Sequence, residues 1–477
     1  MEHQSKNTSG MEREFAERML AHLPFDPSEE QMLLVAGLSR FVLDDDPHTL
    51  FLLRGFAGTG KTSLVGALVR TLGDVGMKAV LMAPTGRAAH VMGDYARHAA
   101  FTIHRRIYRQ QRYGSEAFSL AENKHTDTLF VVDEASMIAD GSGDTVFGSG
   151  NLLDDLMTYV YSGTRCRLLL VGDSAQLPPV GQEESPAMNV ARLQTYGMRV
   201  YEMALRVPAR QQMQSGIVAN ATTLRQAIEA GPAEAPQLRL NGMTDIRAVA
   251  GEDLLETVGD CYDRDGTEQT LIITRSNWRA AQFNAGVRNQ ILYREDELST
   301  GDLLIVAKNN YFWTRGYDGI DFIANGDVAT VSRVRGEVET RYGLRFATVI
   351  LQLPDHNDTE VEAKVVLDGL LGESPALTRT QTERMFNELM AEQTGDRNRR
   401  LRALKDDPYF NALQVKFGYA VTCHKAQGGQ WRNVLIDMGG IAREATTTID
   451  YHRWLYTALT RARRNVFLIN YFPESEP

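Results

Sequence analysis

The sequence predicts an α/β protein that is built on parallel β-sheets. Its short apolar runs are continuous rather than alternating, and loops and helical stretches separate them. Continuous runs are typical of strands buried on both faces, and helices between such strands connect them in parallel. The runs cover residues 50–53, 79–82, 129–132, 167–171, 270–273, 434–436 and 466–469. At about 100–200 residues per domain, 477 residues are enough for several domains.

The long interval between the fifth and sixth runs has a different pattern. Residues 301–353 hold short strand-like pieces separated by glycine turns, which predicts a small antiparallel barrel or sheet. A charged helical stretch follows at 380–405. We therefore expect an inserted β-rich module at 316–414 with a helical return. Apolar residues at helical spacing also predict an N-terminal helix within residues 1–27.

The composition excludes several classes of protein. With 43% hydrophobic and 23% charged residues, the chain is neither wholly disordered nor a collagen or disulfide scaffold. The three cysteines lack zinc-ligand spacing. No apolar run approaches the roughly 20 residues of a membrane span. We expect a cytoplasmic, nucleoid-associated protein without a membrane partner. The net charge of −10 does not favour nucleic-acid binding by the whole surface, but it permits a local basic groove.

The strongest local signal is a phosphate-binding loop. An apolar run leads into Gly-Phe-Ala-Gly-Thr-Gly-Lys-Thr at 55–62, which fits GxxxxGK[ST] before a helical stretch. Glycines let backbone N–H groups face phosphate oxygens, Lys61 can reach the β- and γ-phosphates, and Thr62 can bind Mg²⁺. The predicted nucleotide-binding residues of this loop are Gly55, Gly58, Thr59, Gly60, Lys61, Thr62 and Ser63. We therefore expect ATP and Mg²⁺ as cofactors.

A second apolar run ends in two carboxylates, Asp133 and Glu134. Parallel strands end at one edge of a sheet, so these side chains are expected beside the phosphate loop. Asp133 would hold Mg²⁺, and Glu134 would orient and deprotonate the attacking water. Together with the loop, the pair favours ATP hydrolysis over two solvated acids at a strand end.

Three further motifs narrow the function. They read Gly172-Asp-Ser-Ala-Gln176-Leu-Pro-Pro-Val-Gly, Thr422-Cys-His424-Lys425-Ala-Gln-Gly and Trp454-Leu-Tyr-Thr-Ala-Leu-Thr-Arg461. In this order after the phosphate loop, the motifs resemble superfamily 1B DNA helicases of the RecD-like and Dda-like branch. The resemblance covers about residues 25–471 and implies two RecA-like motor lobes that face each other, with ATP in the cleft.

The resemblance also implies a domain organisation. The first RecA-like lobe would span 28–215 and would carry a strand-separating pin insertion at about 112–126. The second lobe would combine 216–315 with 415–477. The inserted module at 316–414 would be SH3-like.

The family pattern assigns additional residues around ATP. Gln31 would read the adenine edge, because an amide can donate and accept together. Gln176 would sense the γ-phosphate, and Arg210 would contact it, with Arg206 as a nearby alternative. Arg461 would act as an arginine finger that neutralises charge on the transferring phosphoryl group. The implied catalytic residues are therefore Lys61, Glu134, Gln176, Arg210 and Arg461.

The same pattern implies a track for a single strand on both lobes. Hydroxyls and amides at strand ends can hold a phosphodiester backbone of any sequence. The implied DNA-binding residues are Pro84, Thr85, Gly86, Arg87, Thr102 and His104 in the first lobe, and Asn277, Thr422, His424 and Lys425 in the second. A single threonine or histidine at these positions could equally be only a loop cap. The basic, tyrosine-bearing segment at 104–113 places Arg105, Arg109 and Arg112 on one helical face and leads into the pin insertion.

The sequence therefore predicts an ATP hydrolase and DNA helicase that translocates 5′-to-3′ on single-stranded DNA and unwinds forks. The polarity comes from the resemblance alone. One alternative is a translocase that acts on RNA or strips proteins without processive unwinding. A non-enzymatic protein with a degenerate ATPase is disfavoured by the intact Lys61, Asp133, Glu134 and Arg461. We expect a monomeric motor that could serve a DNA replication, repair or recombination complex.

Overall fold

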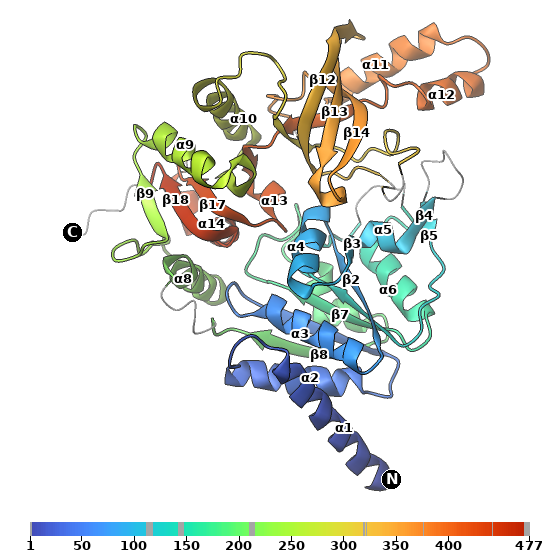
Figure 1. The fold of residues 1–477 in the computed structure, drawn as a ribbon, viewed down its shortest axis with the longest axis vertical. Helices are drawn as coiled ribbons and strands as arrows, with labels where there is room; N and C mark the ends of the chain where they lie inside the picture. The colour runs from blue at the N-terminus through green and yellow to red at the C-terminus, as the bar shows by residue number, and fades with distance from the viewer. Residues whose placement is uncertain are drawn as a thin grey trace. The chain divides into compact units, whose positions relative to one another are not determined.

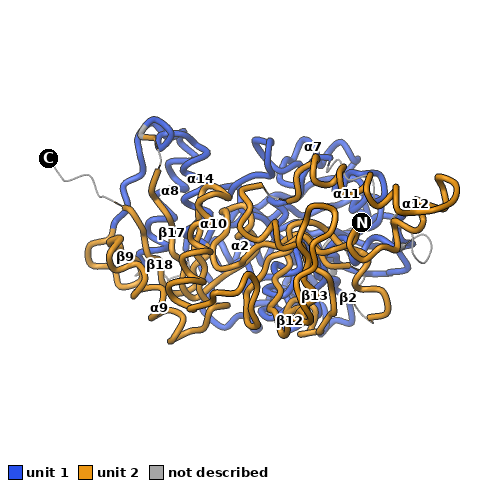
Figure 2. Tube along the Cα trace, turned by 90° about the horizontal axis from the view of Figure 1, so that it is seen from above, with its two compact units in different colours: residues 1–239, 443–460 blue, residues 240–442, 461–477 orange. Residues whose placement is uncertain are grey.

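The chain forms two compact units, which Figure 2 shows in different colours. The computed structural model describes residues 2–110, 118–141, 147–208, 215–317, 320, 322–374, 376–440 and 442–471. Unit 1 comprises residues 1–239 and 443–460, and unit 2 comprises residues 240–442 and 461–477. Each unit contains a parallel sheet and helices, which confirms the predicted α/β class. Within the described residues, no helix combines the length and the apolar character that crossing a bilayer requires.

Unit 1 is built on a six-stranded parallel sheet in the order β3-β2-β6-β7-β1-β8. Its strands are β1 (Thr49–Gly55), β2 (Lys78–Ala83), β3 (Ala100–Thr102), β6 (Thr128–Val132), β7 (Arg167–Gly172) and β8 (Arg199–Leu205). The four predicted apolar runs of this region are β1, β2, β6 and β7. The sequence patterns missed β8 because it is an edge strand whose residues are mostly half-exposed.

The helices of unit 1 begin at the N-terminus, as Figure 1 shows. They are α1 (Glu2–Ala21), α2 (Glu29–Val42), α3 (Lys61–Asp74), α4 (Gly86–Ala96), α5 (Ile103–Ile107), α6 (Leu152–Ser162), α7 (Val190–Gln194), α8 (Gly216–Ala230) and α14 (Ile449–Leu459). The predicted N-terminal helix is present as α1, and Phe15 and Met19 bury one of its faces in a core with α2 and α3. The predicted domains place α8 and α14 in the second lobe, whereas these helices pack together in unit 1.

A short antiparallel hairpin occupies part of the predicted pin insertion at 112–126. Strands β4 (Tyr108–Gln110) and β5 (Phe118–Leu120) form it, and residues 111–117 between them lie outside the described residues. The predicted helical face of three arginines is wrong. Helix α5 ends at Ile107, because the backbone from Tyr108 onward pairs with β5, so Arg109 lies in a strand. Arg112 falls outside the described residues.

Unit 2 contains a five-stranded parallel sheet in the order β16-β10-β17-β18-β9. The strands are β9 (Ile246–Val249), β10 (Thr270–Thr274), β16 (Ala420–Thr422), β17 (Trp431–Asp437) and β18 (Ala462–Ile469). The helices beside it are α9 (Leu254–Asp265), α10 (Asn277–Gly286), a π-helical turn η5 (Val287–Ile291) and the single turn α13 (Cys423–Ala426). The three predicted apolar runs of this region are β10, β17 and β18.

A closed five-stranded barrel completes unit 2. It consists of β11 (Leu303–Val306), β12 (Val328–Arg341), β13 (Leu344–Leu353), β14 (Thr359–Val366) and β15 (Leu413–Phe417). Strand β11 closes the barrel by pairing with both β12 and β15. The barrel strands therefore span residues 303–417, a longer stretch of sequence than the predicted module at 316–414. The difference arises because every strand of a closed barrel needs a partner on both sides.

Two helices connect β14 to β15, and Figure 1 shows them beside the barrel strands. They are α11 (Arg379–Glu392) and α12 (Arg397–Lys405). The predicted helical stretch at 380–405 is thus two helices. Gly395 lies between them with a φ of 110°, a backbone conformation that no continuous α-helix contains.

A buried ionic network joins the barrel to the sheet of unit 2. Asp302, directly before β11, is fully buried and accepts bonds from Arg288 Nε and Nη2, each at 3.1 Å. It also accepts from Arg294 at 2.5 Å and from the hydroxyl of Tyr419, before β16, at 2.9 Å. The Arg288 guanidinium lies 4.3 Å above the ring of Phe417 in β15. One carboxylate thus fixes the entry to β11 against η5 and the β15–β16 connection.

We predict that Asp302→Ala lowers the free energy of unfolding by about 3–5 kcal/mol, because it leaves the buried guanidinium of Arg288 and the half-buried one of Arg294 without their anion. Urea denaturation followed by tryptophan fluorescence measures the change. Asp406→Ala is the matched control, since Asp406 pairs with Arg315 at 2.9 Å but is 74% exposed. Removal of such a surface pair should cost less than about 1 kcal/mol. Equal losses in the two variants would contradict a structural role for the network.

Candidate functional site

The strand order of unit 1 places three motif loops at one edge of its sheet. The neighbours β6, β7 and β1 are parallel, so their carboxyl ends share that edge. The phosphate loop follows β1, Asp173 and Gln176 follow β7, and Asp133 and Glu134 follow β6. The sequence motifs that were predicted to act together therefore lie on adjacent loops.

The phosphate loop has the tight backbone that its glycines predict. Gly58 and Gly60 have φ values of 74° and 83°, in the left-handed region that glycine adopts readily. A Cβ on Gly55 would collide with the side chain of Lys61, and one on Gly60 would lie 2.9 Å from Nε2 of Gln31. Lys61 begins α3, and its ammonium donates to the carbonyls of Gly55 and, at 3.0 Å, of Phe56. The close packing leaves space for glycine alone at two of the predicted loop positions.

Gln31 lies directly beneath this loop. Its amide Nε2 donates to the carbonyl of Thr59 at 2.9 Å, and its Oε1 accepts from the backbone N–H of Ser28 at the same distance. Ser28 in return caps α2, which forms a capping box. The buried amide thus ties the start of α2 to the phosphate loop. Adenine recognition by Gln31 stays a prediction.

The carboxylates after β6 face the polar loop after β7. Asp133 accepts from the backbone N–H of Glu134 at 2.8 Å, and Glu134 has a φ of 52° that turns the chain away from the strand. Nε2 of Gln176 lies 3.4 Å from Oε2 of Glu134. Oε1 of Gln176 is buried and has no hydrogen-bond partner among the described residues. The pair therefore presents a carboxylate and an amide oxygen that can both accept a hydrogen bond from a water molecule.

Asp173 connects these loops to α14. It is buried, and its carboxylate accepts from the hydroxyl of Tyr456 at 2.6 Å and from the N–H of Ala175 at 3.0 Å. The same hydroxyl of Tyr456 accepts from the N–H of Ala57 in the phosphate loop at 2.9 Å. Burial raises the pKa of Asp173, while the charge of Lys61 acts in the opposite direction. Asp173 and Tyr456 both lie within the sequence motifs, but the motifs predicted no role for either residue.

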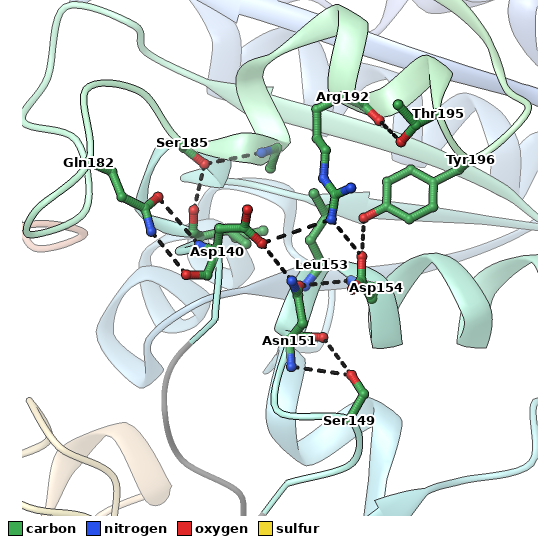
Figure 3. A network of polar contacts seen from close by, with 12 residues as sticks. Asp140, Ser149, Asn151, Leu153, Asp154, Gln182, Ser185, Arg192, Thr195 and Tyr196 are labelled. Atoms are coloured by element: carbon green, nitrogen blue, oxygen red, sulfur yellow. Dashed lines mark hydrogen bonds and ion pairs between the residues drawn. The ribbon is translucent and has the colours of Figure 1, made fainter.

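A polar network holds the segment that follows Glu134, as Figure 3 shows. The buried hydroxyl of Ser185 lies 2.9 Å from the carbonyl of Ala135 and 2.7 Å from that of Ile138. Gln182 bonds both backbone groups of Asp140, and Asn151 donates to its carboxylate at 2.6 Å. The Asp133–Glu134 loop is thus braced by the segment that continues from Gln176.

The metal prediction rests on Thr62 and Asp133. Thr62 lies in the first turn of α3, and Asp133 follows β6. Within the described ranges, no three His, Cys, Asp or Glu side chains gather closely enough to hold a metal. Mg²⁺ is commonly held by one or two protein groups together with phosphate oxygens and water. The hydroxyl of Thr62 and the carboxylate of Asp133 are groups that can hold a Mg²⁺ ion which a nucleotide brings with it.

The predicted DNA contacts of unit 1 lie at the ends of neighbouring strands. Pro84, Thr85, Gly86 and Arg87 follow β2, and Thr102 ends β3. The hydroxyls of Thr85 and Thr102 cap α4 and α5, each accepting a backbone N–H at 3.2 Å. The capping interpretation is therefore correct for both hydroxyls, and strand binding by this edge stays a prediction. The ring of His104 packs 4.9 Å from that of Phe147.

The predicted DNA contacts of unit 2 gather around one cavity. Asn277 at the start of α10, Thr422 at the end of β16 and Lys425 in α13 line it, whereas His424 is exposed. Thr422 differs from Thr85 and Thr102, because its side chain makes no capping bond to α13. Burial, together with the nearby charge of Lys416, lowers the pKa of Lys425 to about 8. The sequence thus predicted three residues that the fold brings together.

The two remaining predicted arginines have different outcomes. Arg461 is buried in unit 2, where its guanidinium donates to the carbonyl of Gly429 at 3.3 Å. Arg210 lies outside the described residues. The backbone N–H of its alternative, Arg206, donates to the carboxylate of Glu30 at 2.8 Å.

Comparisons with known sequences agree with the motif order. Residues 42–226 match the family model described as an AAA domain, and residues 417–469 match the UvrD-like helicase C-terminal domain. The ATP-dependent RecD2 DNA helicase of Deinococcus radiodurans is 27% identical over 443 residues. These matches support the resemblance to RecD-like helicases of superfamily 1. The alignment with this relative covers 88% of the chain but only 47% of the relative's length.

A second relative is similar in its identity and in the share of each chain that the alignment covers. An uncharacterized protein of Methanocaldococcus jannaschii is 23% identical, and the alignment covers 88% of this chain and 36% of that protein. The chain thus spans less than half the length of these curated relatives. Among solved structures, a Bacteroides Pif1 helicase in complex with ADP-AlF3 and single-stranded DNA has a TM-score of 0.44 and 14% identity, with 94% of this chain and 93% of that one covered. A Candida albicans Pif1 helicase has a TM-score of 0.39 and 17% identity, with 94% and 95% covered.

We predict that Lys425→Met stabilises the protein. The lowered pKa means that the folded state disfavours the charged lysine, which the unfolded chain carries at neutral pH. Met keeps the apolar stem and removes the charge, so the free energy of unfolding should rise by about 1–2 kcal/mol at pH 7. The gain should shrink as the pH rises from about 8 toward the unfolded pKa, because the wild-type lysine loses its proton first in the folded state. Urea denaturation at pH 7 and pH 10 measures both effects, and an unchanged or lower stability at pH 7 would contradict the burial of the charge.

Proposed function

We propose that this chain is an ATP-driven DNA helicase that translocates 5′-to-3′ on single-stranded DNA and separates duplex at a fork. The main support for the proposal is the arrangement of three adjacent loops at one edge of the sheet. These loops carry Lys61, Asp133 with Glu134, and Gln176. The polarity rests on the resemblance to RecD-like enzymes alone. The DNA substrate rests on that resemblance and on the D. radiodurans relative, which is named a DNA helicase.

The residues of unit 1 fit a bound nucleotide. The N–H groups of the glycine loop, the ammonium of Lys61 and the N-terminus of α3 would hold the phosphates. Thr62 and Asp133 would hold the Mg²⁺, and Arg461 would serve as the finger of the second lobe. When bound, ATP with Mg²⁺ supplies the phosphoryl group and the cation that neutralises its oxygens.

Glu134 and Gln176 would prepare the attacking water. The carboxylate of Glu134 would accept the proton, and the orphaned Oε1 of Gln176 would accept the second hydrogen bond and fix the direction of attack. Ser185 and its network would keep the loop of Glu134 in place during this step. Hydrolysis would thereby depend on the loop that follows β7.

Asp173 and Tyr456 would report the state of the phosphate loop to α14. Tyr456 bonds both Ala57 and Asp173, and its helix ends two residues before Arg461. If nucleotide binding moved the N–H of Ala57, its hydrogen bond to the hydroxyl of Tyr456 would break or persist with that movement. The covalent continuity from Tyr456 to Arg461 would convert that change into a movement of the finger.

The hairpin of β4 and β5 would act as the strand-separating pin. A wedge needs a rigid base, and Tyr108 donates to the buried carboxylate of Asp155 at 2.7 Å. Phe118 stacks on Phe147 at 4.9 Å, and the N–H of Gly148 donates to the carbonyl of Phe118 at 2.9 Å. These contacts anchor β4 to α6 and β5 to the segment that precedes α6.

Partial duplexes with a 5′ or a 3′ overhang, made of DNA or of RNA, test the function. We predict ATP-dependent unwinding of the DNA duplex with the 5′ overhang and ATP hydrolysis that single-stranded DNA stimulates. Lys61→Ala should lower turnover by about 10²-fold or more, because a cation aimed at the phosphates is lost, and it should still bind single-stranded DNA. Unwinding from the 3′ overhang would contradict the polarity, and equal unwinding of RNA would favour the alternative substrate. Wild-type turnover in Lys61→Ala would remove the phosphate-loop assignment.

Replacing residues 114–122 with a short Gly/Ser linker tests the pin. We predict that DNA-stimulated ATP hydrolysis and translocation on single strands remain, while duplex unwinding is lost, because the wedge performs no phosphate chemistry. The same replacement of the exposed loop at 231–236 is the matched control and should preserve unwinding. If the shortened hairpin unwinds duplex at the wild-type rate, the strands are separated elsewhere.

A further inference from the structure

The cavity of unit 2 extends beyond the residues that the sequence motifs select. It is a hollow that is partly open to solvent, with about 470 Å³ of total empty space, where α10, the barrel and β16 meet. Besides Asn277, Thr422 and Lys425, it is lined by Lys416, which comes from barrel strand β15 and belongs to none of the motifs. The barrel thus adds a second cationic side chain to this cavity.

The charges in the cavity all have the same sign. Among the described residues, Lys416 and Lys425 are the only charged side chains that line it, and none of these lining residues is Asp or Glu. Within the part of the chain that the structure describes, no carboxylate forms an ion pair with either lysine. Two like charges in a half-buried cavity repel each other, and that repulsion is relieved when an anion lies between them.

Each ammonium group keeps donors for such an anion. Lys416 donates to the carbonyl of Gly372, and Lys425 donates to Oδ1 of Asn325. Both acceptors are neutral, and an ammonium has three N–H donors, so each lysine retains two. Burial lowers the pKa of both lysines, and Lys416 contributes to the shift at Lys425. Both lysines thus line one cavity, and among the described residues no carboxylate pairs with either of them.

We propose that Lys416 and Lys425 together bind one phosphodiester group of the single strand, so that barrel strand β15 forms part of the DNA track. The proposal rests on the proposed helicase function, since the predicted strand contacts Asn277 and Thr422 line the same cavity. The hydroxyl of Thr422, which makes no capping bond to α13, supplies a further donor for a phosphate oxygen. The barrel thereby contributes to the affinity for the strand as well as to the fold.

The salt dependence of single-strand binding tests the proposal. We expect Lys416→Gln to reduce the slope of log Kd against log [KCl] by about 0.7, the value for one phosphate contact on a single strand. The affinity lost by the variant should therefore be about fivefold greater at 0.1 M than at 1 M KCl. Lys405→Gln, at the exposed end of α12, removes the same charge and should keep the wild-type slope. Lys416→Arg keeps the charge and should also keep the slope.

Oligonucleotides with one neutral methylphosphonate linkage identify the ligand. In the wild type, one linkage position should weaken binding, and that loss should disappear in Lys416→Gln. If no position depends on Lys416, the lysine serves a free anion and the proposal is overturned. The proposal would also be overturned if the slope for Lys416→Gln equalled that for Lys405→Gln. It would likewise be overturned if Lys416→Arg reduced the slope as much as Lys416→Gln does. Wild-type protein that binds no single strand would instead overturn the proposed function.

Discussion

One buried carboxylate, that of Asp173, holds together segments that are far apart in the sequence. Asp173 follows β7, which lies between the phosphate-loop strand β1 and the strand β6 that precedes Asp133 and Glu134. Its carboxylate accepts a hydrogen bond from the hydroxyl of Tyr456. That hydroxyl reaches the phosphate loop at Ala57. A carboxylate in such surroundings needs hydrogen bonds to remain buried, so its partners cannot move independently. The geometry of the nucleotide site therefore depends on the position of α14.

The sequence was sufficient for those features that are local or periodic. Continuous apolar runs identified β1, β2, β6 and β7, and the glycine spacing identified the loop before Lys61, because each is determined by neighbouring residues. Parallel topology then implied that the loops would share one edge. The closed barrel was foreseen only as a β-rich module, since glycine turns and short strands do not show which strands pair across about a hundred residues.

The remaining features depend on long-range partners. Nothing near Asp302 in the sequence indicates that it will meet Arg288, Arg294 and Tyr419. Lys416 has an ordinary alternating strand around it, and only the fold brings it to Lys425. The early end of α5 has a similar origin, because strand pairing from Tyr108 onward replaces a helical pattern that the arginines alone would favour. Tertiary contacts decided each of these cases against a weaker local preference.

The pairing of β11 with β15 has a consequence for synthesis on the ribosome. Leu304 and Phe417 are register partners, so the barrel cannot close until the intervening residues and both helices between β14 and β15 have emerged. At about 5–20 residues per second, more than a hundred residues take roughly 5–20 s. During that time the apolar edge of β11 lacks one partner, and unpaired strand edges promote aggregation. Nascent chains that stall within the barrel should therefore be clients for chaperones, whereas chains released after β15 should not.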